Sequence, residues 1–248
     1  MAANPESPSF SAMMKTQPLC PEGEEPARAA RLAVQRAAAE LRRGEAIVIA
    51  MAGREALIAI AAELAGRPDL VRLRAEGAGL LLALTSERAA ALGLADGGAS
   101  GTIAVPLGQR VEPAEIVAIA DPSRPVRATA TGWVAGPPLP ASATVAAAVR
   151  MMRIARLLPA ALVVPVTAEA VLAAERDLIV VDVDDLARYD EASASALAIV
   201  GEARVPLAGA ETARLIAFRP QDGGNEHLAV VIGTPEPGQP VLARIHSE

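Results

Sequence analysis

The last residues of the chain, VLARIHSE (241–248), bring together side chains that could do chemistry. Arg244, His246 and Glu248 alternate along this stretch, and His246 is one of only two histidines in the 248 residues. If the stretch is a strand, the three side chains share one face. They could then bind a phosphate or a purine, or activate water. A solvated edge strand whose charges prevent aggregation fits the same pattern, and the spacing alone favours neither interpretation.

The rest of the chain offers few other reactive groups. Residues 27–190 contain neither histidine nor cysteine, which removes thiol nucleophiles, histidine catalysis and soft-metal sites from that region. Asp182, Asp184 and Asp185 cluster directly after an apolar run and could hold Mg²⁺ through water. We favour a solvated loop whose aspartates complement the start of the next helix.

Composition limits the classes of partner. The net charge of −6, with a single lysine, does not support a nucleic-acid-binding surface. No apolar run approaches the roughly 20 residues that cross a membrane, so we expect no membrane partner. The single cysteine, Cys20, excludes an intrachain disulfide and fits a reducing compartment. We expect a cytoplasmic protein.

The elements that must position these residues follow from hydrophobic periodicity and from turn signals. We expect a disordered, Pro-rich arm over 1–26 and an α/β (α+β) layered domain over 27–195, because apolar strands alternate there with helical patterns. Ser86 and Thr167 are the expected N-caps of two of the helices. The predicted helices cover 27–43, 54–66, 71–76, 86–94, 112–121, 143–158, 167–177 and 183–192. The predicted strands cover 46–50, 79–85, 102–107, 161–166 and 178–182.

The hydrophobicity pattern changes after about residue 195, where the alternation of strands and helical patterns ends. Four short apolar stretches at 202–209, 212–220, 227–234 and 240–248 are separated by turn residues such as QDGGNE and PEPGQP. They predict an antiparallel β meander over 196–248, with His227 and His246 both on strands. About fifty residues is small for an independent domain.

The meander resembles the opening of GTP cyclohydrolase II. The motifs that carry the resemblance are EHLAVVIG (226–233) and PVLARIHSE (240–248). The resemblance implies opening of the guanine imidazole ring of GTP by a zinc-bound water, with release of formate and pyrophosphate. It also implies that Arg244, Ile245, His246, Ser247 and Glu248 contact GTP.

In that family, a cysteine that is the first of three zinc ligands follows the HSE triplet directly. We therefore expect no catalytic residue and no metal ligand within these 248 residues, and zinc only in a longer protein. We also expect the chain alone to be inactive.

Residues 27–195 resemble 3,4-dihydroxy-2-butanone 4-phosphate synthase, most clearly in GLLLALTSERAAALGL (79–94). The family's acidic Mg²⁺ loop is AMAGREAL (50–57) here, and its R-x-G-H-T-E-A segment is ASATVAA (141–147). Hard cations need oxygen ligands and proton abstraction needs a base, and both segments have lost them. We expect this domain to have lost its Mg²⁺ site and its activity, and to form a homodimer.

Three hypotheses follow for the function. The first is a GTP cyclohydrolase II of the riboflavin pathway, of which this chain carries only the start of the catalytic domain. The second is a non-enzymatic pseudoenzyme that serves as a dimerisation scaffold for that pathway. The third is residual synthase activity, which incubation with ribulose 5-phosphate and Mg²⁺ would reveal.

Overall fold

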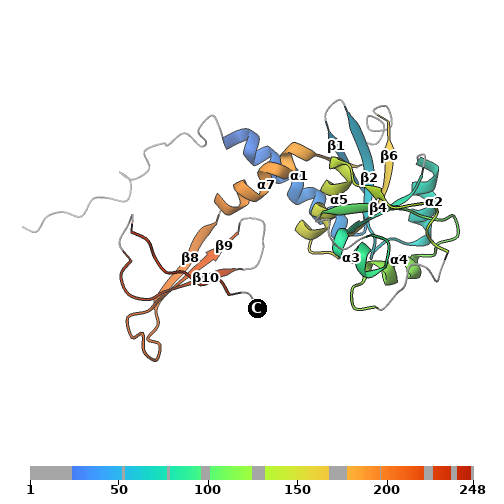
Figure 1. Cartoon of the computed structure of the whole chain (residues 1–248). Helices are drawn as coiled ribbons and strands as arrows, with labels where there is room; N and C mark the ends of the chain where they lie inside the picture. The colour runs from blue at the N-terminus through green and yellow to red at the C-terminus, as the bar shows by residue number, and fades with distance from the viewer. Residues whose placement is uncertain are drawn as a thin grey trace, which may run out of the picture. The chain divides into compact units, whose positions relative to one another are not determined.

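The computed structural model describes residues 24–51, 54–76, 79–95, 101–124, 132–167, 178–195, 197–220, 226–235 and 239–246. Contacts between residues divide the chain into two compact units, Met1–Arg188 and Tyr189–Glu248 (Figure 1). The division falls within helix α7 (Val183–Ser195), a few residues before the predicted boundary after residue 195.

A seven-stranded mixed sheet forms the centre of the first unit, in the order β5-β4-β3-β6-β2-β1-β7. Neighbouring strands are antiparallel, except that β1 and β7 are parallel. The strands are β1 (Ile47–Met51), β2 (Glu55–Ala61), β3 (Leu81–Thr85), β4 (Thr102–Pro106), β5 (Leu139–Pro140), β6 (Ala160–Val166) and β7 (Ile179–Asp182).

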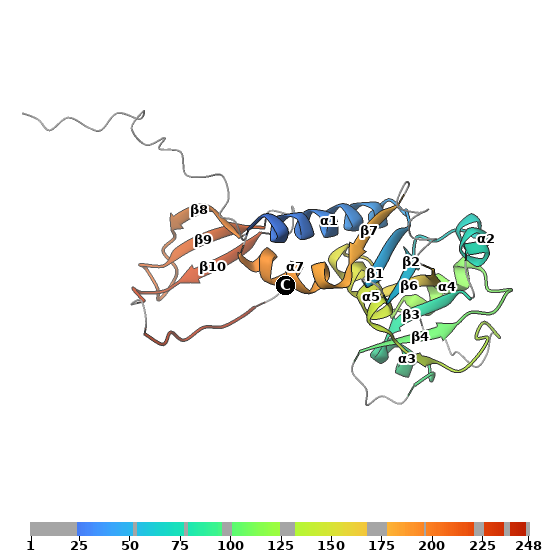
Figure 2. The same ribbon diagram turned by 90° about the horizontal axis from the view of Figure 1, so that it is seen from above.

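Helices lie on both sides of this sheet, as the α/β pattern of the sequence predicts. Helix α5 packs against β1, β2, β3, β4 and β6, and it also contacts α1, which packs against β7. Figure 2 shows α5 on one side of the strands and α2 and α4 on the other. The helices with described bounds in this unit are α1 (Glu24–Arg42), α2 (Arg67–Glu76), α3 (Ser86–Ala91), α4 (Pro113–Ala120) and α5 (Ala143–Ile154).

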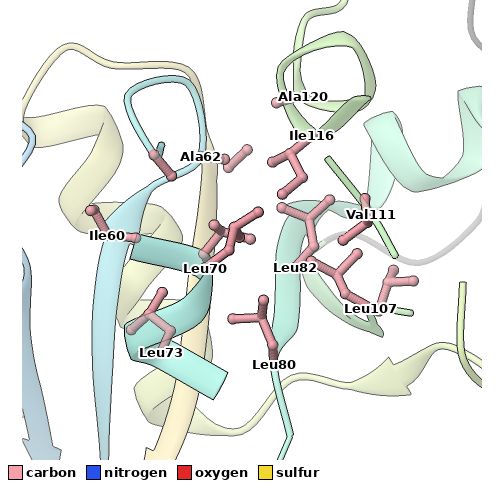
Figure 3. Packing of buried hydrophobic residues seen from close by; sticks show 14 of the residues in the cluster. Ile60, Ala62, Leu70, Leu73, Leu80, Leu82, Leu107, Val111, Ile116 and Ala120 are labelled. Carbon is pink, nitrogen blue, oxygen red and sulfur yellow. The ribbon is translucent and has the colours of Figure 1, made fainter. Parts of the chain in front are cut away.

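The hydrophobic core between the sheet and helices α2 and α4 is shown in Figure 3. Leu82 from β3 is fully buried there against Leu70 of α2 and Ile116 of α4. Trp133, the only tryptophan, belongs to the same cluster and is 2% exposed. Met151 and Met152 of α5 are fully buried.

The predicted helix over 54–66 is wrong, because Glu55–Ala61 is strand β2. β2 lies between β1 and β6 and pairs with both. A strand buried on both faces has no polar alternation, so its apolar run cannot be told from a buried helix by periodicity. Pairing with β1 and β6 therefore makes this segment a strand, although its alanine-rich composition favours a helix.

Two helix starts differ from the expectation. The N-cap of α3 is Thr85 and not Ser86, because the Thr85 hydroxyl accepts a hydrogen bond from the backbone N–H of Arg88 at 3.2 Å. Helix α1 begins at Glu24, inside the predicted arm, where acidic residues and a first-turn proline favour a helix start. Residues 1–23, and the predicted helix over 167–177 beyond Thr167, lie outside the described residues.

The second unit contains a three-stranded antiparallel sheet in the order β10-β9-β8. Its strands are β8 (Ala198–Arg204), β9 (Arg214–Arg219) and β10 (His227–Val231). The meander is thus confirmed as antiparallel, but the described part has three of the four predicted strands. Within the described part of the chain, no helix is long and apolar enough to cross a membrane.

Candidate functional site

The segment predicted to contact GTP is exposed in the second unit. Arg244, Ile245 and His246 are all exposed, and the Ile245 side chain is 97% accessible. Neither Arg244 nor His246 has an ion pair or hydrogen bond to another described side chain. Both side chains are therefore available to a ligand. Ser247 and Glu248 lie outside the described residues.

The expectation that Arg244 and His246 lie on a strand is not met. The described residues 239–246 form no strand and pair with none of the described strands. A strand exists only when a neighbour takes up its backbone hydrogen bonds, and none of the described strands pairs with this segment. The shared face of Arg244, His246 and Glu248 therefore remains a prediction that depends on a partner strand.

His227, the other histidine, lies on β10 opposite Phe218 of β9. Its side chain is exposed, and no described interaction joins it to Arg244 or His246. The structure thus confirms that His227 is on a strand, but it does not bring the two histidines into one site.

The residues present do not fit a zinc site. No group of three or more His, Cys, Asp or Glu side chains that could hold a metal occurs among the described residues. A catalytic zinc needs about three protein ligands. We therefore assign no step of chemistry to a metal held by these residues.

The two segments that resemble synthase active-site motifs meet in the first unit. The first contains Glu55, at the start of β2, and the second forms the first turn of α5. The Glu55 Oε1 atom accepts a hydrogen bond from the backbone N–H of Thr144 at 3.2 Å. The N-cap Ser142 accepts from the N–H of Val145 at 3.4 Å. The carboxylate that this loop retains thus contacts free backbone donors at a helix start.

The side chains of the Thr-Ser-Glu-Arg stretch (85–88), which belongs to the synthase resemblance, make structural contacts in this chain. The Arg88 Nε atom donates to the carbonyl of Ile119 at 2.7 Å, and its Nη2 donates to that of Ala118 at 3.2 Å. These carbonyls lie at the end of α4, where no further helical N–H can reach them. Burial lowers the pKa of the Arg88 guanidinium. Arg88 therefore stabilises the end of α4 from α3.

Glu87, in the same stretch, is the acidic residue in the first turn of α3. A hydrogen bond from its own backbone N–H and one from the Thr85 hydroxyl lower the pKa of its carboxyl. Its negative charge also suits the helix N-terminus. Thr85, Glu87 and Arg88 thus act at helix ends, and the Ser86 hydroxyl donates to the carbonyl of Gly101 at 3.3 Å.

The aspartates lie at the start of α7, as favoured from the sequence, but they do not form a loop, because Asp182 ends β7 and Asp184 and Asp185 belong to the first turn of α7. The Asp182 Oδ1 atom accepts a hydrogen bond from the backbone N–H of Asp184 at 2.8 Å, at the start of α7. Asp185 pairs with Arg188 at 3.2 Å, one turn further along the helix. The aspartates thus cap and pair locally.

Sequence reasoning missed the contact between Glu55 and Thr144 and the role of Arg88. Each joins residues that are far apart in the chain, and neither has a local motif. A signal existed for Glu55 alone, since it is the carboxylate left in a loop that otherwise lost its acids.

The fold and the exposed segment define a two-part chain, in which an α/β unit is followed by an antiparallel sheet. Residues 198–248 match the family model of GTP cyclohydrolase II. The chain is also 44% identical over 226 residues to the GTP cyclohydrolase-2 of Azospirillum brasilense. This match covers 89% of the chain and 58% of the relative, so the chain spans less than two thirds of that protein. The resemblance to GTP cyclohydrolase II is confirmed.

Two solved structures are more distantly similar. RibBX, a two-domain 3,4-dihydroxy-2-butanone 4-phosphate synthase from A. baumannii, has a TM-score of 0.49 at 17% identity, over 83% of this chain and 71% of its own. A 3,4-dihydroxy-2-butanone 4-phosphate synthase in a cation-free form has a TM-score of 0.49 at 18% identity, over 64% of this chain and 96% of its own.

Proposed function

We propose that the chain forms the first part of a GTP cyclohydrolase II of riboflavin biosynthesis, which opens the imidazole ring of GTP and releases formate and pyrophosphate. The observation that carries this proposal is the match of residues 198–248 to the GTP cyclohydrolase II family. The 44% identity to a GTP cyclohydrolase-2 that extends well beyond this chain supports it.

In this proposal the segment from Arg244 to Glu248 contacts GTP. The Arg244 guanidinium can form two parallel hydrogen bonds to a phosphate or to a purine edge. The His246 imidazole can donate or accept one more hydrogen bond. Both side chains are exposed and unpaired among the described residues, which suits groups that bind a ligand. Ile245 would offer an apolar contact, and Ser247 and Glu248 would supply further polar groups.

The catalytic zinc that the family implies would be held outside the described residues, since these contain no suitable group of ligands. The contribution of this chain to the reaction is therefore substrate contact, and we expect the chain alone to be inactive. The lost Mg²⁺ site of the first unit and the homodimer remain predictions.

The first unit serves in this proposal as a non-catalytic scaffold. Two observations support that role. Glu55 contacts the start of α5, and Arg88 binds carbonyls at the end of α4, so both side chains have structural partners. Residual synthase chemistry would need a base and a cation site instead.

Nucleotide binding tests the role of Arg244. Residues 1–248 can be joined to the part of the A. brasilense relative that continues beyond its match, and GTP binding measured by calorimetry. The variant Arg244→Ala should raise the Kd for GTP by about 10- to 100-fold, because a charge-assisted hydrogen bond contributes roughly 1.5–3 kcal/mol. Arg36→Ala, at an exposed arginine of α1, is the matched control. An unchanged Kd in Arg244→Ala would refute the assigned role.

A further inference from the structure

Two hydrogen-bond donors of the first unit are buried without an acceptor among the described residues. They are the Nε atom of Arg74, in the last turn of α2, and the indole Nε1 atom of Trp133. Trp133 is 2% exposed, and Arg74 is partly buried. Buried N–H groups nearly always have a partner, because leaving one unpaired costs free energy. Both donors therefore indicate an acceptor that the described residues do not supply.

Gly108 holds Arg74 and Trp133 next to each other. The backbone N–H of Gly108 donates to the carbonyl of Trp133 at 2.7 Å, and the Gly108 carbonyl accepts from Nη2 of Arg74 at 2.8 Å. A Cβ atom at position 108 would lie 3.3 Å from the Trp133 carbonyl oxygen, closer than side chains usually come. Glycine thus permits this close approach. Leu73 (Figure 3), which precedes Arg74, belongs to the same core cluster as Trp133.

The charge of Arg74 favours an anion as the acceptor. Within the described part of the chain, the polar partner of Arg74 is the neutral carbonyl of Gly108, and no carboxylate forms an ion pair with it. A guanidinium that is partly removed from water is stabilised by a paired anion. Ordered water satisfies neutral donors but carries no charge. An oxyanion has several lone pairs, so it can accept from Arg74 and Trp133 together.

We propose that Arg74 and Trp133 form a binding site for a small oxyanion, a phosphate or a carboxylate group, beside the turn that begins at Gly108. The Nε atom of Arg74 and the Nε1 atom of Trp133 donate to the oxygens of the anion. Arg74 is partly exposed, so the ligand reaches these donors from its solvent side. The inference goes beyond the proposed function, because it gives the first unit a ligand of its own.

Intrinsic fluorescence tests the proposal, because Trp133 is the only tryptophan of the chain and reports on this site alone. The full 248-residue chain is titrated with inorganic phosphate and, separately, with acetate, at an ionic strength held constant with sodium chloride. The test variant is Arg74→Met, which keeps an unbranched stem and loses the donors and the charge. The matched control is Arg72→Ala, at an exposed arginine of the same helix.

We expect a saturable change in Trp133 emission with at least one of the two anions, and the anion with the lower Kd identifies the group. Arg72→Ala should bind with the wild-type Kd. Arg74→Met should raise the Kd by at least about tenfold, because hydrogen bonds from a charged donor are the strong ones. The absence of saturation with both anions would overturn the proposal and leave water as the acceptor. An equal Kd in Arg74→Met and Arg72→Ala would overturn it as well.

Two further variants keep the proposal testable if Arg74→Met does not fold. Arg74→Lys retains the charge but cannot place a donor at the position of Nε, so its Kd should rise several-fold. Trp133→Phe keeps an aromatic ring and loses the donor, and calorimetry replaces fluorescence for this variant. Wild-type affinity in both Arg74→Lys and Trp133→Phe would show that neither donor contacts the anion and would refute the site.

Discussion

The Glu55 carboxylate accepts a hydrogen bond from the backbone N–H of Thr144 at 3.2 Å, and so ties the start of β2 to the first turn of α5. Helix starts have four N–H groups without helical partners, and a carboxylate is favourable there. The two segments joined in this way are the ones in which the sequence has lost the acidic loop and the histidine of the synthase motifs. The contact gives the remaining glutamate a structural role.

Removing the Glu55 side chain should therefore destabilise the first unit. We expect Glu55→Ala to lower the free energy of unfolding by about 1 kcal/mol, the usual effect of losing a capping interaction. Glu55→Gln, which keeps an acceptor and loses the charge, should cost less. Urea denaturation measures both variants, with Glu45→Ala at an exposed glutamate as control. Unfolding free energies equal to that of the control would contradict the capping role.

Arg88 should contribute more to the free energy of unfolding than Glu55, because it binds several carbonyl groups near the end of α4. Arg88→Ala should lower the free energy of unfolding by about 2 kcal/mol, since hydrogen bonds to a charged group are stronger than neutral ones. Arg88→Lys should recover only part of this loss, because an ammonium cannot reproduce the planar fork of a guanidinium. Denaturation of Arg72→Ala, at an exposed arginine of α2, provides the control. Full stability in Arg88→Lys would show that charge alone suffices.

The pH dependence of stability can be traced to Asp121, the C-cap of α4. Hydrogen bonds from the Ser123 hydroxyl and the Ser123 backbone N–H lower the pKa of the Asp121 carboxyl. A lowered pKa in the folded state stabilises the fold above the ordinary carboxyl pKa, and this stabilisation is lost as the pH falls through the lowered value. The difference in Tm between the wild type and Asp121→Ala should thus shrink on acidification. A difference that is independent of pH would mean that the charge is not involved.

The synthase reaction should be absent from the first unit. Incubation of the chain with ribulose 5-phosphate and Mg²⁺ should yield no four-carbon phosphate, because 50–57 keeps a single carboxylate, Glu55, and 141–147 has neither a carboxylate nor a histidine. Mass spectrometry of the products, beside an active synthase as positive control, decides the point. Product formation above background would overturn the scaffold role.

The sequence predicts the helices and strands whose signals lie within the segment itself. It does not predict a conformation or a contact that depends on residues far away in the chain. The buried runs at β3 and β6 and the periodic helix α5 are found because their patterns lie within each segment. β2 is missed because its alanine-rich run becomes a strand only between β1 and β6. Arg88 is missed because its acceptors lie about thirty residues further along the chain.

The same reason limits the prediction of the candidate site. The residue types of Arg244 and His246 are visible in the sequence, but their shared face needs a neighbouring strand that the described residues do not include. The motif can therefore be recognised from the chain, whereas the geometry of the site depends on what packs beside it.

Formate release from GTP tests the central claim most directly. The purified 248-residue chain should release none above background. The same chain joined to the part of the A. brasilense relative beyond its match should release formate, and Arg244→Ala should reduce that rate. Formate release by the 248 residues alone would contradict the account, and so would undiminished release by the joined Arg244→Ala protein.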